Sequence, residues 1–364
     1  MVGGFLGAGK TTAVARLAQR LSDQGFKVGL ITNDQGRELV DTKMLRAKGF
    51  ATEEIPGGCF CCRFNSLVDA AERLTSETQP DVFIAEPVGS CTDLVATVTY
   101  PLRRIYGDQF TISPVSVLVD PIRAARVLGL QEGGNFSEKV VYIYRKQLEE
   151  ADYIVINKTD LLLPEQVEEL RTALSIEFPR SEVLGVSARD GSNLDAWFSR
   201  IEEGEQGRAP AMEVDYDLYA DGEALLGWYN STVRLQAPAP FEAEPVLQHL
   251  CREIQQRLQA AGAEVAHLKM TLSPDEALAG EIAVINLVRN DVVPELSLRL
   301  PEPVSGGQLI INLRAEGAPE SLAEFVAASL RTLWEAHRVR ANTEHLEHFR
   351  PGRPTPTHRD AAAK

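Results

Sequence analysis

The chain has 364 residues, about the length of two ordinary domains, and 44% of them are apolar, which is enough for a sizeable buried core. Its net charge of −15, from 37 basic and 52 acidic residues, argues against nucleic acid or an anionic membrane as a partner. No apolar run approaches the roughly 20 residues of a membrane-spanning helix, and the glycine-rich N-terminus does not resemble a signal peptide. We therefore expect a cytoplasmic protein whose five cysteines are reduced.

Short apolar runs alternate with amphipathic stretches through residues 1–203. The apolar runs predict strands at Lys27–Thr32, Val82–Ala85, Val115–Val119, Tyr153–Ile156 and Glu182–Val186. None of these runs alternates polar with apolar residues, as expected where helices cover both faces of a parallel sheet. Helical periodicity lies between them. We therefore expect residues 1–203 to form an α/β domain that binds its ligand at the carboxyl ends of the strands.

Residues 4–12 read GFLGAGKTT and satisfy the pattern G-x-x-x-x-G-K-[ST], the phosphate-binding loop (P-loop) between a strand and a helix. Glycines let successive backbone N–H groups converge on a phosphate without obstruction by side chains. Lys10 is expected to reach the β and γ phosphates and to act in catalysis, while the Thr11 hydroxyl is expected to bind Mg²⁺. The nucleotide-binding residues predicted by this motif are Gly4, Gly7, Ala8, Gly9, Lys10, Thr11 and Thr12.

The strand that should precede this loop is short in the sequence. Only Met1, Val2 and Gly3 stand before Gly4, whereas a strand usually has about 5 residues. We expect the chain as given to be truncated and the native protein to carry several aliphatic residues upstream. Low stability and weak nucleotide affinity are the expected consequences, because unpaired buried backbone groups cost about 1–3 kcal/mol each.

Two acidic residues follow predicted strands. Asp34, in the sequence NDQG, is a candidate to orient an attacking water or to touch the metal, and an ordinary Asp in a turn is the alternative. Glu86, in the sequence EPVG, can hold Mg²⁺ through water, while the N–H of Gly89 can sense the γ-phosphate. An ordinary acid between strand and loop remains the alternative for Glu86. With Lys10, these two acids are the predicted catalytic residues.

Three cysteines lie within four residues of one another, in the sequence GGCFCC. The thiols of Cys59, Cys61 and Cys62 can converge on one soft cation, and three protein ligands leave a tetrahedral site open for transfer of the ion. Their alternative role is that of small buried apolar residues. Cys91 is a possible further ligand, and Cys251 is expected to lie in the core face of a helix.

The sequence NKTD follows the predicted strand Tyr153–Ile156. The carboxylate of Asp160 can accept hydrogen bonds from the ring N–H and the exocyclic amine of guanine, a donor pair that adenine lacks. Together with Asn157 and Lys158, it forms the guanine-reading pattern N-K-x-D. A polar helix start capped by Asp160 is the alternative. Ser187 and Ala188, after the next strand, match the S-A element that buttresses guanine.

The alternation of short apolar runs with amphipathic stretches ends after residue 203. Residues 204–226 are acidic and contain interspersed Gly and Pro, so we expect an interdomain linker. A smaller α+β domain is predicted over residues 227–340, and residues 341–364 are expected to be an extended tail that is mobile from Phe349. The predicted elements of this domain are the strands Tyr229–Gln236, Val265–Leu272, Glu281–Val288 and Leu309–Leu313 and the helices Glu242–Ala260 and Ser321–His337.

The order GFLGAGKTT, GGCxCC, ExxG and NKxD resembles the CobW-type metallochaperone GTPases over roughly the first 200 residues. Asp34 stands where that family usually has Glu, and Pro87 where it often has Ser or Thr. The resemblance implies a P-loop α/β domain followed by a smaller α+β domain. It also implies binding of GTP and Mg²⁺, slow hydrolysis of GTP, and binding of zinc or cobalt at the C-x-C-C motif for delivery to a client protein.

The sequence thus favours a GTPase that hands a transition metal from Cys59, Cys61 and Cys62 to an unidentified client metalloprotein. The alternative is a regulatory module that senses GTP and metal and hydrolyses GTP only incidentally. An unrelated P-loop kinase is a third possibility, against which the N-K-x-D motif argues. Thiolates accept Zn²⁺, Co²⁺ and other soft ions, so the sequence does not identify the metal.

Overall fold

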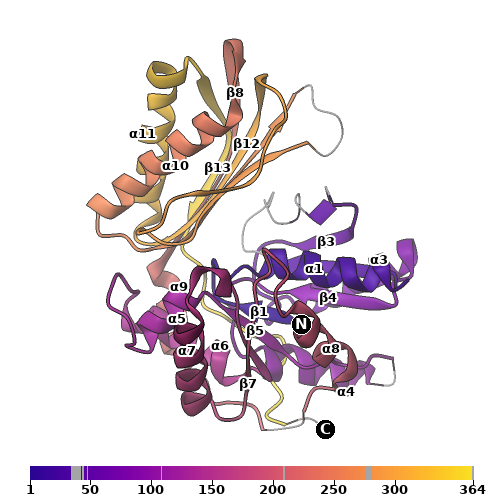
Figure 1. The fold of residues 1–364 in the computed structure, drawn as a ribbon. Helices are drawn as coiled ribbons and strands as arrows, with labels where there is room; N and C mark the ends of the chain where they lie inside the picture. The colour runs from indigo at the N-terminus through magenta and orange to yellow at the C-terminus, as the bar shows by residue number, and fades with distance from the viewer. Residues whose placement is uncertain are drawn as a thin grey trace. The chain divides into compact units, whose positions relative to one another are not determined.

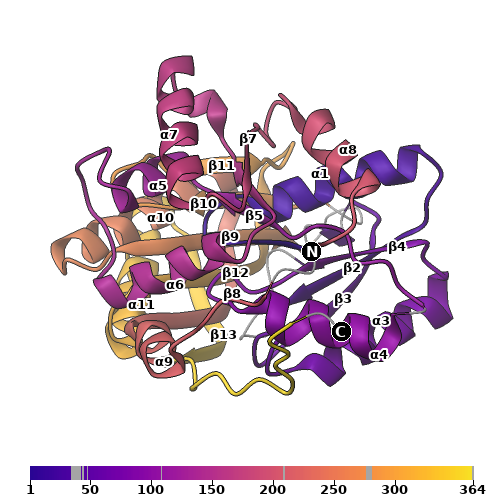
Figure 2. The same ribbon diagram turned by 90° about the horizontal axis from the view of Figure 1, so that it is seen from below.

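The computed structural model describes residues 1–33, 42, 45–46, 48–107, 109–207, 210–275 and 281–362, and Asp34 lies outside these residues. The chain divides into two compact units (Figures 1 and 2). The first unit takes in the described parts of 1–35, 50–222 and 353–364, and the second those of 36–49 and 223–352. In the part of the chain that is described, no helix is both long and apolar enough to cross a membrane.

The first unit is built on parallel strands. One sheet has the order β1-β5-β6-β7, with bounds Val2–Gly4, Ser116–Val119, Tyr153–Ile156 and Glu182–Gly185. The other has the order β3-β2-β4, with bounds Ala51–Ile55, Val28–Asn33 and Val82–Glu86. Its helices are α1 Lys10–Asp23, α3 Phe64–Thr78, α4 Tyr100–Tyr106, α5 Pro121–Val127, α6 Glu138–Glu149, α7 Pro164–Glu177, α8 Leu194–Glu203 and α9 Tyr216–Leu225, the last of which crosses the boundary between the units.

The five strands predicted from apolar runs are all present, and the predicted α/β fold is confirmed. Every residue of β2 and β5 is buried, which explains why their sequences do not alternate. Strand β3 was not predicted. Its sequence, ATEEI, contains two adjacent acids and buries only Thr52 and Ile55, so it carries no apolar run.

Strand β1 consists of three residues and pairs in parallel with β5, from Val2 opposite Ser116 to Gly4 opposite Leu118. The N–H of Ser116 also donates to the carbonyl oxygen of Met1 at 3.2 Å. Among the described residues, β4 forms a ladder with β2 and none with β1. The short strand before the P-loop is therefore present, and the expectation of further residues upstream stays a prediction.

The second unit contains one antiparallel sheet of six strands in the order β11-β10-β9-β12-β8-β13. Helices α10 Ala243–Ala260 and α11 Pro319–His337 cover one face of it, and their apolar residues share a buried core with the strands (Figure 1). Cys251 is fully buried in this core, as predicted. The strand bounds are β8 Leu226–Phe241, β9 Val265–Pro274, β10 Ala283–Leu287, β11 Glu295–Leu298, β12 Val304–Glu316 and β13 Arg340–Phe349.

The boundaries beyond residue 203 differ from the prediction. Helix α9 and the first residue of β8 occupy part of the predicted linker 204–226. The predicted tail 341–364 is wrong over its first part, because β13 pairs with β8 at the edge of the sheet. The side chains of β13 are mostly exposed and polar, so its sequence shows no apolar periodicity. Residues 353–362 then return to the first unit.

Candidate nucleotide and metal sites

The P-loop connects β1 to α1 and contains three glycines with positive φ: 131° at Gly4, 80° at Gly7 and 90° at Gly9. A Cβ atom on Gly9 would lie 2.4 Å from Nδ2 of Asn157. The Nζ of Lys10 donates to the carbonyl oxygens of Gly4 at 2.8 Å and Phe5 at 3.4 Å. This backbone conformation suits a loop whose N–H groups surround a phosphate at the N-terminus of α1.

The N-K-x-D residues contact the P-loop and the S-A element at the same time. Nδ2 of Asn157 donates to the carbonyl oxygen of Ala8 at 2.9 Å, and Oδ1 of Asn157 accepts from the N–H of Ala188 at 2.9 Å. Oδ1 of Asp160 accepts from the Ser187 hydroxyl at 2.7 Å. The sequence motifs predicted separately therefore meet in one place, where the Asp160 carboxylate keeps 16% of its side-chain surface exposed.

Lys158 lies across the P-loop and has an unpredicted partner. Its backbone is left-handed, with φ of 59°, and its Nζ donates to the carbonyl oxygen of Gly7 at 2.7 Å and to Oδ2 of Asp120 at 2.9 Å. Asp120 also accepts from the N–H of Arg123 and so caps α5. An acid directly after a predicted strand and before Pro121 was the signal that could have identified it.

Two arginines contact the S-A and N-K-x-D segments and were not identified from the sequence. Nε and Nη2 of Arg16, on α1, donate to the carbonyl oxygens of Ala188 at 3.2 Å and Arg189 at 2.8 Å. The Arg189 guanidinium lies 3.2 Å from Oδ2 of Asp160. Arginine on the polar face of a helix is ordinary, so no sequence pattern distinguished Arg16.

Thr11 and Glu86, each predicted separately to hold Mg²⁺, contact one another beside the P-loop. The Thr11 hydroxyl donates to Oε1 of Glu86 at 2.9 Å, and both residues are buried. Oxygen donors of this kind fit Mg²⁺, which prefers carboxylate and hydroxyl ligands together with phosphate. Thr12, predicted as a further nucleotide contact, is exposed. The role predicted for Asp34 lies outside the described residues.

Gly89 packs directly against the P-loop. A Cβ atom at this position would lie 2.8 Å from the backbone nitrogen of Leu6, so only glycine fits without displacement of the loop. Nε2 of Gln147, on α6, donates to the carbonyl oxygens of Gly89 and Cys91, both at 2.9 Å. The segment that follows Glu86 is thus fixed between the P-loop and α6.

The three sulfur atoms of Cys59, Cys61 and Cys62 lie within 4.8 Å of one another, in the turn between β3 and α3. Sγ of Cys62 is 3.3 Å from that of Cys59 and 3.6 Å from that of Cys61. Sγ of Cys59 and Sγ of Cys61 are the closest pair, and metal binding by all three cysteines requires them as reduced thiolates. This convergence of soft donors fits a thiophilic cation.

The cysteine turn is held from strand β2. Nδ2 of Asn33 donates to the carbonyl oxygens of Ile55 at 2.9 Å and Gly58 at 2.6 Å. The N–H of Arg63 closes the turn by donating to the carbonyl oxygen of Cys59 at 2.9 Å. Cys91, considered as a further ligand, is buried elsewhere and is not in the cysteine cluster.

These features define a P-loop nucleotide-binding domain in which the N-K-x-D and S-A segments lie beside the P-loop and three cysteines form a cluster. The chain belongs to the family described as CobW/HypB/UreG, nucleotide-binding domain, whose model matches residues 1–183. The resemblance to the CobW-type proteins is thereby confirmed, and the family is one of P-loop GTPases.

Two curated relatives match about half of their length to this chain. Zinc chaperone YeiR of Escherichia coli (strain K12) is 30% identical over 174 residues, which cover 47% of this chain and 49% of that protein. Zinc chaperone CobW of a Sinorhizobium species is 30% identical over 213 residues, covering 52% of this chain and 58% of that protein.

Two solved structures are also similar. HypB from Archaeoglobus fulgidus, a hydrogenase maturation factor, has a TM-score of 0.38 and 21% identity, covering 56% of this chain and 87% of that one. Zn(II)-bound YjiA GTPase from E. coli has a TM-score of 0.33 and 15% identity, covering 91% of this chain and 97% of that one.

Proposed function

We propose that this protein is a Mg²⁺-dependent GTPase that carries zinc or cobalt on Cys59, Cys61 and Cys62 and delivers it to a client metalloprotein. The observation that supports it best is the set of contacts made by Asn157. This side chain joins the phosphate loop to the guanine-reading loop, in the same unit as the cysteine cluster. The names of YeiR and CobW, both zinc chaperones, favour zinc as the cargo.

GTP would be held at both ends, at its phosphates and at its base. The P-loop backbone and Lys10 would bind the phosphates, while Asp160, buttressed by Ser187, would accept hydrogen bonds from guanine. Mg²⁺, held through Thr11 and Glu86, would neutralise charge on the phosphates. Hydrolysis would then rest on positioning, with Glu86 or Asp34 orienting the attacking water and slow intrinsic turnover expected.

The cysteine cluster suits an ion that must leave again. Three thiolates leave one tetrahedral position open, through which a client ligand can attack the bound ion. The Asn33 side chain couples this turn to the end of β2, directly before Asp34. Movement of the end of β2 on GTP hydrolysis would therefore alter the hydrogen bonds that support the cysteine turn.

The alternative is a regulatory module that senses GTP and metal and docks onto a partner, with hydrolysis incidental. The two functions differ in the fate of the metal. A chaperone should lose its zinc to an apo-client during GTP turnover, and the client should accelerate hydrolysis. A sensor should keep its zinc while bound to the partner.

The test begins with reduced protein. Binding of GTP, ATP, Zn²⁺ and Co²⁺ is measured by calorimetry, and metal content is then followed for protein purified from its native cell with GTP and with GDP. The proposal expects a strong preference for GTP over ATP and one tightly bound transition metal per chain. Equal affinity for ATP, or no tight metal under reducing conditions, would contradict it.

A further inference from the structure

The last residues of the chain lie against the cysteine turn. We define the C-terminal strap as Thr355–Asp360, which belongs to the first unit although the preceding strand β13 belongs to the second. The strap has no regular secondary structure. Prolines at positions 354 and 356 restrict its backbone to extended conformations, which lowers the entropy lost when it docks.

One end of the C-terminal strap contacts the cysteines directly. The backbone N–H of Thr355 donates to Sγ of Cys62 at 3.1 Å, although the two residues are 293 positions apart in the chain. The N–H of Thr357 donates to the carbonyl oxygen of Cys61 at 2.9 Å, and its hydroxyl donates to that of Cys62 at 3.2 Å. These bonds fix both the sulfur atom and the backbone of the turn.

His358 extends this contact to the helix that follows the cysteines. Its ring packs edge-on against Phe64, the first residue of α3, with ring centroids 4.8 Å apart. Phe64 is itself buried. The strap therefore follows the cysteine turn from Cys61 to the start of α3.

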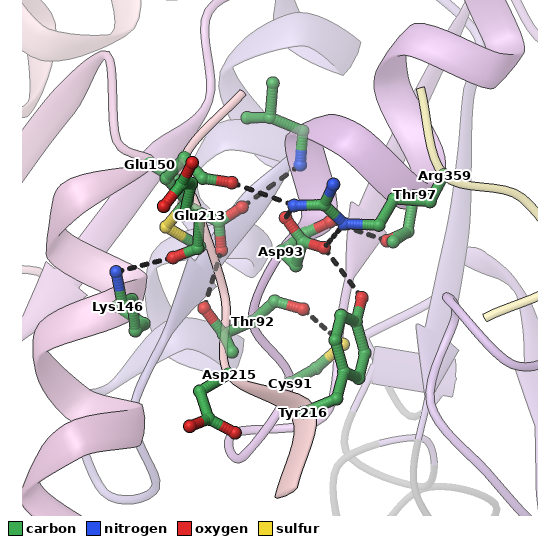
Figure 3. A network of polar contacts seen from close by, with 12 residues as sticks. Cys91, Thr92, Asp93, Thr97, Lys146, Glu150, Glu213, Asp215, Tyr216 and Arg359 are labelled. Atoms are coloured by element: carbon green, nitrogen blue, oxygen red, sulfur yellow. Dashed lines mark hydrogen bonds and ion pairs between the residues drawn. The ribbon is translucent and has the colours of Figure 1, made fainter. Parts of the chain in front are cut away.

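The other end of the C-terminal strap is anchored in a buried polar network (Figure 3). Nε of Arg359 donates to Oδ2 of Asp93 at 2.8 Å, and its Nη2 donates to the carbonyl oxygen of Met212 at 2.8 Å. The N–H of Asp360 donates to the carbonyl oxygen of Ala96 at 2.8 Å. Arg104, on α4, pairs with the Asp360 carboxylate at 2.7 Å.

Asp93, which pairs with Arg359 to anchor the strap, is a buried and tightly constrained carboxylate. Its side chain is 1% exposed, its backbone is left-handed with φ of 63°, and its Oδ2 also accepts from the Tyr216 hydroxyl at 2.7 Å (Figure 3). A buried carboxylate without a cationic partner is strongly unfavourable. The ion pair with Asp93 therefore stabilises the docked position of Arg359 and of the strap. The anchor lies in the segment that follows Gly89, the glycine packed against the P-loop.

We propose that the C-terminal strap is a positioning element of the metal site: the Thr355 N–H orients and stabilises the Cys62 thiolate as a ligand, and the Arg359–Asp93 pair holds the strap in place. Hydrogen bonds to metal ligands fix ligand orientation and tune affinity, and their loss typically costs about 10–100-fold in metal affinity. The proposal rests on the metal-binding function proposed above and adds the residues that support it.

The test compares Thr355→Pro with Thr355→Ala. Proline removes the backbone N–H and fits a segment already flanked by prolines, whereas alanine keeps the N–H. Affinities for Zn²⁺ and Co²⁺ are measured on the reduced, full-length protein by competition with a chromophoric chelator. The Co²⁺ form also reports its thiolate ligands through sulfur-to-cobalt charge-transfer absorption.

We expect Thr355→Pro to weaken metal binding by about tenfold or more and to change the charge-transfer band, while Thr355→Ala matches the wild type in both. Equal affinity and equal spectra for the two variants would overturn the role of the strap. Wild-type protein that binds neither metal would instead overturn the proposed metal-binding function, and with it this inference.

The anchor is tested by Arg359→Ala, with Arg171→Ala as a matched control that removes an exposed ion pair with Glu168 on α7. Loss of the anchor should release the strap and weaken metal binding as Thr355→Pro does, whereas the control should bind metal normally. Unchanged metal affinity in Arg359→Ala would contradict the anchoring role. If Arg359→Ala does not fold, Thr355→Pro still decides the proposal, because it disturbs no buried ion pair.

Discussion

The nucleotide region and the cysteine region of the first unit are assembled in different ways. In the nucleotide region, the P-loop, N-K-x-D and S-A segments follow β1, β6 and β7, which belong to one parallel sheet. The carboxyl ends of parallel strands lie on one edge, so these loops meet without further help. In the cysteine region, a single turn gathers its supporting contacts from Asn33 and from the C-terminal strap.

The two regions differ in what brings residues that are distant in the sequence into contact. The sheet places the side chains of the nucleotide region, so each is held by neighbours of regular geometry. The cysteine turn is held by the last residue of β2 and by the irregular C-terminal strap, which docks through the pair of Arg359 with the buried Asp93. We therefore expect the nucleotide site to tolerate loss of the strap and the metal site to depend on it.

The largest expected effect is a loss of metal binding that leaves GTP binding unchanged. Replacement of Cys59, Cys61 and Cys62 together by Ser removes all three soft ligands, so metal affinity should fall by several orders of magnitude. GTP affinity should be retained, because the residues predicted to bind GTP include no cysteine and lie in the P-loop, N-K-x-D and S-A segments. Calorimetry of the reduced protein with Zn²⁺ and with GTP measures both.

Cys91→Ala is the matched control for the triple variant, since Cys91 is not in the cysteine cluster. It should bind Zn²⁺ as tightly as the wild type. Tight zinc binding by the triple variant, or its loss in the control, would show that the ligands have been assigned wrongly. If GTP raises metal affinity in the wild type, metal must raise GTP affinity by the same factor.

The second prediction concerns the close approach of the P-loop to Asn157. Gly9→Ala places a Cβ atom 2.4 Å from Nδ2 of Asn157 and adds a side chain at φ of 90°. Overlap and strain together should cost about 3–5 kcal/mol in GTP binding or stability. Gly25→Ala is the control, because its φ is 93° and nothing lies within 4 Å of its added Cβ.

The control should lose only about 1–2 kcal/mol of stability from backbone strain and keep normal GTP affinity. Chemical denaturation and GTP titration of both variants distinguish strain from overlap. Equal losses for the two glycines would mean that the contact between the P-loop and Asn157 does not exist in solution.

The sequence predicted the parts of the molecule whose patterns repeat. Apolar runs identified five parallel strands, and the P-loop and N-K-x-D motifs directly follow β1 and β6. The roles of Lys10, Asn157 and Asp160 in binding GTP stay predictions. Strand β13 was missed because an exposed edge strand has no apolar periodicity. The strap contacts escaped prediction because the Thr355 bond is made by a backbone N–H, which every residue except proline possesses.

The third prediction tests guanine reading at Asp160. Asp160→Asn should weaken GTP binding by about 2–4 kcal/mol, because charge-assisted hydrogen bonds are lost and an amide donor faces a donor on guanine. The same variant should gain affinity for xanthosine triphosphate, whose base presents an acceptor at that position. Asp195→Asn, at an exposed acid on α8, is the control and should leave both affinities unchanged. Unaltered GTP affinity in Asp160→Asn would rule out the assignment.

The smallest effect concerns the buried network beneath the strap anchor (Figure 3). Glu150, after the end of α6, accepts hydrogen bonds from the N–H of Val95 at 3.0 Å and the hydroxyl of Thr92 at 3.3 Å. The pKa of Glu150 is raised to about 8, chiefly by burial; the hydrogen bond from Val95 opposes this rise and the negative charge of Asp93 adds to it. A carboxyl with this pKa binds a proton in the folded state that it has lost in the unfolded state at neutral pH.

The sign of the pH dependence follows from that difference. Because the folded-state pKa of Glu150 lies above the usual value of 4.5, its contribution to stability is complete below pH 4.5 and is lost as the pH rises to about 8. Glu150→Gln cannot ionise, so it should become more stable than the wild type as the pH rises, by about 1–3 kcal/mol at pH 8. Glu149→Gln, at a half-exposed neighbour paired with Lys146, should change stability by less than about 0.5 kcal/mol at any pH. Urea unfolding at pH 5.5, about 7 and about 8.5 measures these differences, and a Glu150→Gln advantage that does not grow with pH would show that Glu150 is already ionised in the folded protein.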